Sequence, residues 1–260
     1  MAISTNLVTF PLYIPRICAL FVNWPEYLAN YALRRRKRAE YVLRDGYKLV
    51  DGTGTLAGTI AVVFVRREYG EFRDFKTIVD IGANMGSFAI YAARCCPDAK
   101  IYCYEPHPEN FKFLMQNIVV NSLEQRLKAV QSAVAATSGE RTFGLGESPT
   151  HSLVGAESGS TGSVACTTLT EIFSLHHLDT IDLLKINCEG AEYEILESCP
   201  AADFRRISNI RLEYHDLDDE RNGRSIARLL EKRGYRIQRY TRYIERSGLF
   251  KQSGFIWADR

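Results

Sequence analysis

The chain has 260 residues, of which 46% are hydrophobic and 25% charged, and its formal net charge is +2. These values are ordinary for a folded globular protein and exclude a persistently disordered chain. Positive charge is concentrated in residues 1–50, which hold eight Lys/Arg against three Asp/Glu. A nucleic-acid footprint spread over the whole surface is therefore excluded.

The first predicted segment, residues 1–75, is an N-terminal cap that precedes the main domain at 76–260. A helix is expected over residues 26–44, because Pro25 suits a helix start and apolar residues then recur on one face. Short apolar runs near 47–50 and 59–65 predict strands. The cap is expected to help shape the pocket for a substrate.

An apolar stretch within this cap runs into a basic one. Residues 17–33 are fairly apolar, and RRRKR follows at 34–38. The stretch is interrupted and too short to cross a bilayer. We favour a helix with a solvated basic face. The alternative is peripheral contact of residues 17–38 with an anionic membrane surface.

The cysteines and histidines predict neither a disulfide framework nor a metal site. Seven cysteines form no C-x-x-C pair, which favours a reducing compartment. His176 and His177 have no acid pair at ligand spacing, so no metal is predicted. No secretory signal is recognised at the N-terminus. We expect a cytoplasmic protein, with membrane association as the alternative and no nucleic-acid partner.

From Thr77 onward, strand-like and helix-like segments alternate. Strands are predicted over residues 77–82, 100–105, 126–134, 183–188, 209–215, 235–241 and 254–259. Helices are predicted over residues 86–95, 108–120, 189–199 and 223–233, and a Gly/Ser-rich stretch occupies 144–163. This alternation predicts an α/β fold with a doubly wound, mostly parallel sheet and helices on both faces.

The turn after the first of these strands carries residues expected at a ligand. They are Asp80, Gly82, Ala83, Asn84 and Gly86. The glycines let the backbone bend tightly and approach a ligand, and the helix that follows offers unpaired N–H groups. Glu105 ends the second strand, where a carboxylate can accept both hydroxyls of a ribose. The pattern predicts a cofactor that contains a nucleoside.

Two cofactors compete for this turn. A nicotinamide dinucleotide requires G-x-G-x-x-G, and Asn84 stands where the second glycine is needed and would crowd a pyrophosphate. S-adenosylmethionine carries no phosphate, and Asn84 suits its charged amino-acid end. Asp80 also favours a cationic ligand. We favour S-adenosylmethionine, with a nicotinamide-dependent oxidoreductase as the alternative.

Four blocks, in order, resemble the motifs of the FkbM family of S-adenosylmethionine-dependent methyltransferases. They are DIGANMG, YEPHPENFKFLMQNIVVN, LLKINCEGAEYEIL and RLEYHDL, and the resemblance extends over roughly residues 42–216. It implies a class I, Rossmann-like methyltransferase fold, with a seven-stranded sheet whose last strand is antiparallel. It also implies O-methylation of a hydroxyl on a saccharide or another natural product.

The resemblance also implies which residues hold the cofactor. These are Gly82, Asn84 and Gly86 at the methionine end, Glu105 at the ribose, and Ser132 and Ala133 near the adenine. The family usually has Asp in its LKIDxEG block, whereas this chain has Asn187. The substitution removes a carboxylate that could bind an ammonium, a metal or a substrate hydroxyl. A non-catalytic module that binds S-adenosylmethionine is therefore a second alternative.

The candidate catalytic residues lie at the ends of two later strands. Asn187 and Glu189 alternate at the end of one, and Glu213 and His215 at the end of the other. An alcohol becomes a good nucleophile only as its proton leaves, so a base is desirable. We predict His215 as this base because imidazole titrates near neutrality, with Glu213 or Glu189 orienting it or binding the substrate. The alternative is that His215 and Glu189 only stabilise the local fold.

Overall fold

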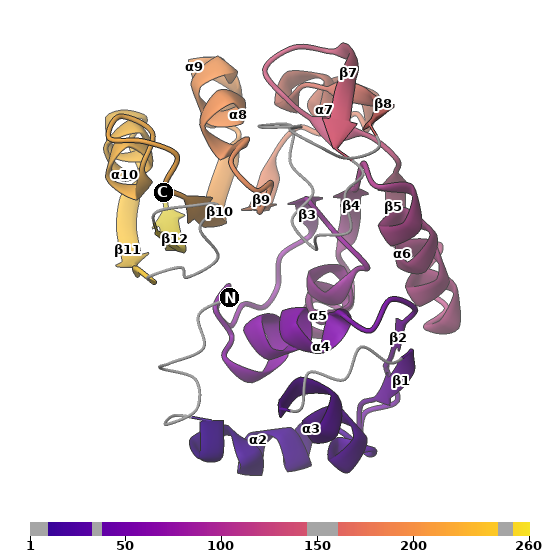
Figure 1. Ribbon diagram of the computed structural model, residues 1–260. Helices are drawn as coiled ribbons and strands as arrows, with labels where there is room; N and C mark the ends of the chain where they lie inside the picture. The colour runs from indigo at the N-terminus through magenta and orange to yellow at the C-terminus, as the bar shows by residue number, and fades with distance from the viewer. Residues whose placement is uncertain (1–9, 33–37, 145–160, 244–251) are drawn as a thin grey trace.

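The computed structural model describes residues 10–32, 38–144, 161–243 and 252–260. A seven-stranded sheet runs through the centre of the molecule (Figure 1). In spatial order its strands are β11 (Arg236–Tyr240), β12 (Ser253–Asp259), β10 (Ile207–His215), β9 (Ile181–Ile186), β3 (Thr77–Ile81), β4 (Lys100–Tyr104) and β5 (Leu127–Val130). Only β12 runs antiparallel to its neighbours within this sheet. The predicted doubly wound sheet with an antiparallel last strand is confirmed.

Helices cover both faces of the sheet and bury its alternating side chains. One face packs against α4 (Leu56–Ile60), α5 (Ser87–Cys95) and α6 (Pro108–Val120). The other packs against α7 (Leu169–Leu175), α8 (Glu192–Ser198), α9 (Ala201–Phe204) and α10 (Gly223–Lys232). On β3, Ile78 joins the first apolar cluster and Val79 the second. A strand buried on both faces needs apolar side chains on both, and Ile78, Val79 and Ile81 supply them, while Asp80 is a buried polar exception.

The N-terminal segment differs from its prediction in two places. It contains η1 (Phe10–Tyr13), α2 (Ile14–Leu20), α3 (Trp24–Ala32), β1 (Ala39–Val42), β2 (Lys48–Asp51), α4 and the π-helical turn η2 (Ala61–Val65). The helix predicted over 26–44 was wrong at residues 39–42, because these pair with β2 in a hairpin. The strand predicted over 59–65 was also wrong. That segment is helical and largely buried, and a short apolar run does not distinguish a strand from a buried helix.

Side chains on and just after α6 hold the β1–β2 hairpin against this helix. Asn117 Oδ1 accepts a hydrogen bond from the backbone N–H of Val50 at 2.6 Å, and Asn121 Oδ1 accepts one from Lys48 at 2.8 Å. One apolar cluster also contains residues from both sides of residue 75. The domain boundary at residue 75 stays a prediction.

A small second sheet follows β5. It consists of β6 (Ala133–Val134), β8 (Thr161–Thr167) and β7 (Gly139–Gly144). The single strand predicted over 126–134 is therefore two strands in two sheets, separated by a turn in which Ser132 N–H donates to Val130 O at 3.0 Å. Most of the Gly/Ser-rich stretch at 144–163 lies outside the described residues.

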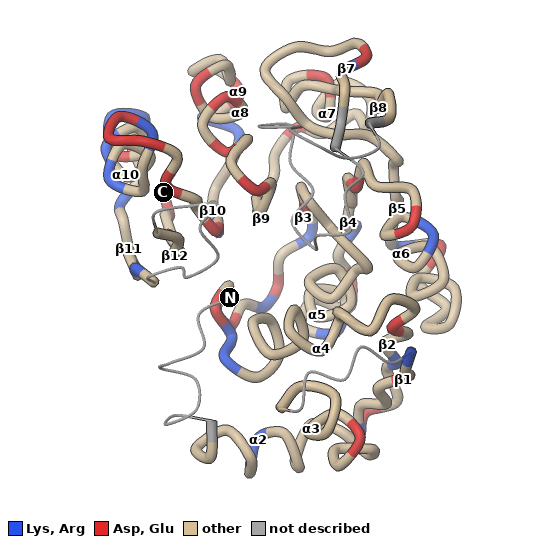
Figure 2. Tube along the Cα trace, in the orientation of Figure 1, with Lys and Arg blue, Asp and Glu red and all other residues tan. Residues whose placement is uncertain are grey.

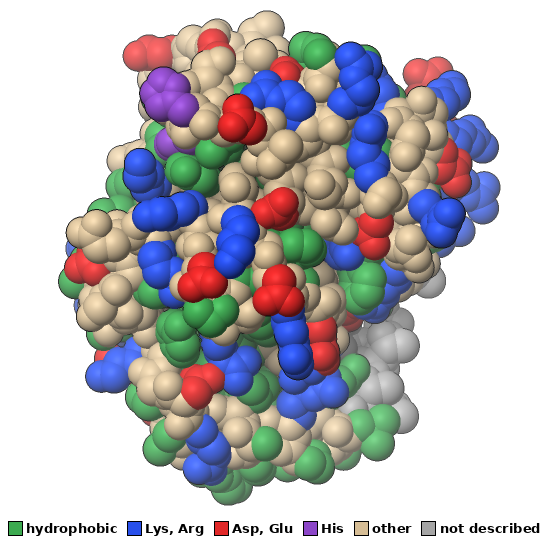
Figure 3. Space-filling view, turned by 180° about the vertical axis from the view of Figure 1, so that it is seen from behind, with side chains coloured by type: hydrophobic (Ala, Val, Ile, Leu, Met, Phe, Trp, Pro, Cys, Tyr) green, Lys and Arg blue, Asp and Glu red, His purple; other side chains and the backbone are tan. Residues whose placement is uncertain are grey.

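Charged residues of both signs are dispersed along the described trace (Figure 2). Figure 3 shows the same mixture on the back of the molecule, with hydrophobic side chains along the lower edge, where Figure 1 places α2 and α3. Leu12, Ile14 and Val22 are among the exposed apolar residues. None of the helices in the described ranges is long and apolar enough to cross a bilayer. Most of the basic run at 34–38 lies outside those ranges, and membrane contact stays a prediction.

Candidate functional site

The parallel strands end together and bring the predicted site residues to one edge of the sheet. Ile81 at the end of β3 aligns with Tyr104 on β4 and with Ile186 on β9. Ile186 in turn aligns with Leu212 on β10. The residues that follow these positions therefore share the carboxyl edge, where open α/β sheets bind ligands. They are Gly82, Glu105, Asn187 and Glu213.

The turn after β3 has a backbone that only small or adaptable residues can adopt. Gly82 has φ 73°, and a Cβ there would lie 1.8 Å from the backbone oxygen of Asn187. Gly86 has φ 91° at the start of α5. Asn84 has φ 51°, a left-handed conformation that Asn tolerates better than most residues. Between these glycines, Ala83 is buried. The close approach of the β3 and β9 ends therefore depends on Gly82.

Glu105 joins the turn after β3 to the end of β4. Its Oε2 accepts a hydrogen bond from the backbone N–H of Asn84 at 2.7 Å, and its Oε1 accepts one from the N–H of His107 at 2.9 Å. Burial raises the pKa of Glu105 to about 7, although these backbone donors oppose the change. A carboxylate has further lone pairs, so it can also accept ribose hydroxyls.

Asp80 lies beneath the turn instead of facing a ligand. It is fully buried, and its Oδ1 lies 2.8 Å from Lys185 Nζ on β9. Lys185 Nζ also donates to the backbone oxygen of Gly82 at 2.7 Å. Because Lys185 balances its charge, Asp80 holds the turn in place through the ion pair. Its predicted contact with a cationic ligand finds no support in this geometry.

The residues predicted near the adenine are buried, and their contacts are mostly with other parts of the protein. Ser132 is buried, and its hydroxyl donates to the backbone oxygen of Ala165 at 2.9 Å, while Ala133 is buried in β6. A cavity of about 120 Å³ lies beside them, at the ends of β4 and β5. It is lined by Pro106, Pro108, Gln131 and residues 162–165. Pro106 and Gln131 line this cavity, and neither was among the residues predicted near the adenine.

A three-residue hydrogen-bonded group lies at the ends of β9 and β10. Asn187 Nδ2 donates to Glu213 Oε2 at 2.8 Å and to the Tyr69 hydroxyl at 3.3 Å. The Tyr69 hydroxyl donates to the same Glu213 oxygen at 3.4 Å. In the described part of the chain, Glu213 Oε1 makes no hydrogen bond, and the buried Asn187 Oδ1 has no donor. Glu213 retains intermediate exposure to solvent.

His215 lies between two carboxylates. Its Nδ1 lies 3.2 Å from Glu192 Oε1, and its Nε2 lies 3.4 Å from Glu189 Oε2. Burial alone would lower the pKa of His215, but Glu189 and Glu192 outweigh it and raise the pKa to about 10. The imidazole is therefore protonated at neutral pH and has no free lone pair with which to accept a proton. This geometry does not favour His215 as the base.

Glu192 and Glu189 also shape the loop between β9 and α8. The buried Glu192 carboxylate accepts backbone hydrogen bonds from Cys188 at 2.8 Å and Gly190 at 2.9 Å. Glu189 adopts φ 52°, which is uncommon for a residue with a Cβ. Such strain is often found at functional sites. Glu189 and His215 are thus brought together as predicted, while Glu192 is a partner that the sequence prediction did not assign to His215.

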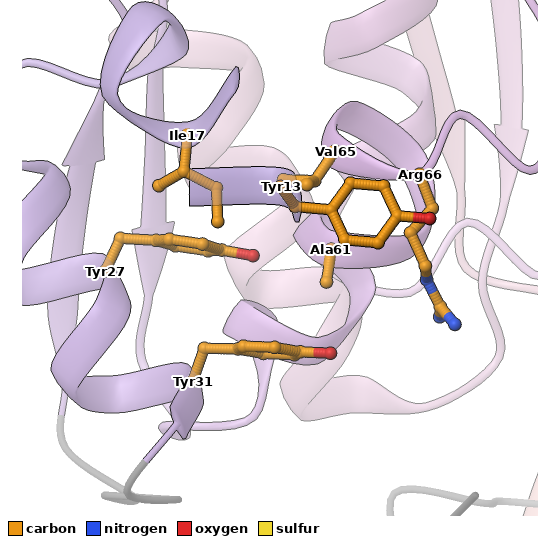
Figure 4. A pocket seen from close by; sticks show the side chains of 7 residues that line it. All are labelled: Tyr13, Ile17, Tyr27, Tyr31, Ala61, Val65 and Arg66. Carbon is orange, nitrogen blue, oxygen red and sulfur yellow. The ribbon is translucent and has the colours of Figure 1, made fainter. Parts of the chain in front are cut away.

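The described parts of the chain hold no metal-binding cluster, and a second cavity is small. No group of three or more His, Cys, Asp or Glu there is arranged to hold a metal ion. A cavity of about 10 Å³ lies in the N-terminal segment (Figure 4), lined by Tyr13, Ile17, Tyr27, Tyr31, Ala61, Val65 and Arg66. That volume admits about one water molecule. It is too small for a methyl acceptor.

Comparisons with known proteins agree with this geometry. The model of the methyltransferase FkbM domain matches residues 80–237. The methyltransferase sdnD of Sordaria araneosa is 28% identical over 62% of this chain and 74% of its own length. The 31-O-demethyl-FK506 methyltransferase FkbM of Streptomyces tacrolimicus is 26% identical over 57% of this chain and 68% of its own.

Among solved structures, Mycoplasma capricolum TrmK in complex with S-adenosylhomocysteine covers 75% of this chain. The match covers 66% of the TrmK chain, with a TM-score of 0.49 and 12% identity.

Proposed function

The chain belongs to the FkbM family of S-adenosylmethionine-dependent methyltransferases, and on this premise we propose that it methylates a hydroxyl group of a saccharide or another natural product. The Glu213 carboxylate is the main support for oxygen as the methylated atom. Its Oε2 accepts hydrogen bonds from Asn187 and Tyr69, and its Oε1 makes no hydrogen bond in the described residues. A hydroxyl needs such a base, because it is a poor nucleophile until its proton leaves. The Streptomyces relative is named as a 31-O-demethyl-FK506 methyltransferase, which supports the same choice.

The residues at the carboxyl edge fit a cationic adenosyl cofactor. Gly82 lets the ends of β3 and β9 approach each other, and Glu105 lies at the end of β4, where its carboxylate can accept ribose hydroxyls. Asn187 Oδ1 is a buried acceptor without a donor in the described residues, which a cofactor ammonium could supply. When bound, S-adenosylmethionine supplies a methyl group on a cationic sulfur, so the leaving group is already activated.

Glu213 receives the proton in this proposal. As the hydroxyl oxygen bonds to the methyl carbon, the hydroxyl proton moves to Glu213 Oε1, and the electron pair of the broken C–S bond stays on sulfur. Burial raises the pKa of Glu213, while His215 and Arg66 lower it. The positive charge of His215 therefore helps to keep the base ionised. In this proposal His215 lowers the pKa of Glu213 through its positive charge, and it is not itself the base that was predicted.

The test supplies the protein with S-adenosylmethionine and a panel of methyl glycosides and hydroxylated macrolactones, and measures S-adenosylhomocysteine formation. We expect turnover with a free hydroxyl and none with the matching O-methylated compound. Glu213→Gln should lower kcat by about 10²–10⁴-fold without changing the Kd for S-adenosylhomocysteine. The matched control is Glu194→Gln, which breaks a half-exposed pair with Arg141. Wild-type protein that binds the cofactor but methylates no hydroxyl, amine or carboxyl group would support the non-catalytic alternative.

A further inference from the structure

Tyr69 reaches Glu213 across 144 positions of sequence. Its ring is 3% exposed and packs edge-to-face between Phe88 and Phe255, with centroid distances of 5.3 and 5.2 Å. A ring enclosed on both sides fixes where its hydroxyl points. That hydroxyl accepts from Asn187 and donates to Glu213.

The backbone on both sides of Tyr69 is held to distant elements. The Glu68 backbone oxygen accepts a hydrogen bond from Trp257 Nε1 on β12 at 2.8 Å. The Gly70 backbone oxygen accepts one from the Tyr91 hydroxyl on α5 at 3.1 Å. The position of the Tyr69 hydroxyl is thus set by the core and does not depend on a free loop.

We propose that Tyr69 and Asn187 are positioning residues that hold Glu213 by Oε2 and leave Oε1 for the proton of the acceptor. The inference rests on the proposed function, because it assumes that Glu213 is the base. Tyr69 lies before residues 80–237, which match the family model. Tyr69, which lies outside the matched region, therefore forms part of the hydrogen-bonded group around Glu213.

Both positioning side chains donate to Glu213 without competing for its proton. Burial raises the pKa of Tyr69, so its phenol stays neutral and keeps its hydrogen. The Asn187 amide does not titrate. The charged groups that act on Glu213 are His215 on its own strand, Arg66 after η2, Lys185 on β9 and Glu192 on α8. The first three favour the ionised carboxylate and Glu192 opposes it.

Asn187 donates a hydrogen bond to Glu213 that an aspartate at this position would not provide when ionised. A carboxylate at this position would place an oxygen about as close to Glu213 Oε2 as the amide nitrogen is now, 2.8 Å. Two carboxylates at such a distance share a proton, so one of them titrates at a higher pH. In this chain the amide keeps Glu213 available as a base.

The first test measures the protonation of Glu213 without requiring any methyl acceptor. The infrared band of its protonated carboxyl is identified as the band that Glu213→Gln removes, and its intensity is followed against pH. Tyr69→Phe should raise the midpoint by about one pH unit, because one hydrogen bond to the charged form is lost. Asn187→Asp should raise it further. Tyr235→Phe is the matched control, since Tyr235 is equally buried and hydrogen-bonds to the Phe204 and Ile207 backbone instead.

The second test follows kcat against pH with the best acceptor from the panel described above. Tyr69→Phe should lower kcat about tenfold and move the acid limb upward, while the KM for S-adenosylmethionine stays unchanged. Midpoints and kcat values that coincide in Tyr69→Phe, Tyr235→Phe and wild type would overturn the inference, even if wild type is active. If wild type methylates nothing but the midpoints shift as expected, the positioning stands and the proposed function fails.

Discussion

The two halves of the carboxyl edge are held by different means. At β3 and β4, Glu105 is fixed by backbone N–H groups within two strand–turn–helix units that are adjacent in sequence. At β9 and β10, Glu213 and His215 are fixed by side chains from several separate segments. Backbone donors keep their place when side chains change, whereas a side-chain group depends on each member.

This difference separates binding from catalysis in the molecule. The half that is expected to hold the cofactor can be assembled from a short stretch of chain. The half that is expected to act on the acceptor forms only when the N-terminal segment, β9, β10 and α8 are all packed in their final positions. Substitutions in the first half should therefore affect cofactor binding, and substitutions in the second half should affect proton transfer and the stability that the side-chain group provides.

The largest effect on stability is expected from Gly82→Ala, which changes the point where the two halves of the carboxyl edge meet. The new Cβ would lie 1.8 Å from the Asn187 backbone oxygen, at φ 73°. We expect the free energy of unfolding to fall by about 3 kcal/mol or more, measured by urea denaturation. Gly58→Ala is the control, because a Cβ there meets nothing within 4 Å and Ala favours a helix. Equal free energies of unfolding for the two variants would show that the ends of β3 and β9 can move apart without a loss of stability.

A smaller loss is expected from His215→Gln, which tests the side-chain half. Removing the imidazolium leaves Glu189 and Glu192 without their shared cation, and we expect a loss of roughly 2–4 kcal/mol near neutral pH. The folded pKa of His215, about 10, exceeds its ordinary value of 6.5. Its stabilisation is therefore complete below about pH 6.5 and is lost as the pH rises through about 10.

Denaturation of wild type and His215→Gln at several pH values would check this expectation. The two curves should converge as the pH rises toward about 10. His177→Asn, at an exposed position, should follow wild type throughout. A constant gap between wild type and His215→Gln would argue against the buried imidazolium.

The smallest effect is expected from Glu105→Gln, which tests the backbone-held half. Burial raises the pKa of Glu105 to about 7, so the carboxylate form, which accepts ribose hydroxyls best, increases as the pH rises through that value. Calorimetry should show S-adenosylhomocysteine binding more tightly to wild type above about pH 7 than below it. The variant should bind about tenfold more weakly at high pH and show little pH dependence. Glu109→Gln, exposed in the first turn of α6, is the control.

The sequence predicted the positions of Gly82 and Glu105 at the sheet edge because the information for them is local. A strand, a glycine turn and a helix follow one another, and parallel pairing places Gly82 and Glu105 at the same edge. The alternation of strands and helices likewise predicted the large sheet. The small sheet after β5 was missed because Ala133–Val134 is too short to show a pattern of its own.

The second half was predicted only in part. Asn187, Glu213 and His215 were identified because strand ends are the expected positions, but their partners depend on tertiary packing. Tyr69 follows a segment that was taken for a strand, and no periodic pattern links it to residue 213. The charges of Glu189 and Glu192 then decide the charge of His215, which sequence spacing alone does not reveal.

The position of β12 has a consequence for synthesis of the protein. This late strand is inserted between β10 and β11, and Trp257 within it supports the backbone beside Tyr69. Until the ribosome has released residues 253–259, the nascent chain exposes an unpaired edge of β10, which invites association with other strands. The acceptor side should therefore reach its folded form only after β12 has been released, and chaperones that shield β edges should improve the yield of active protein.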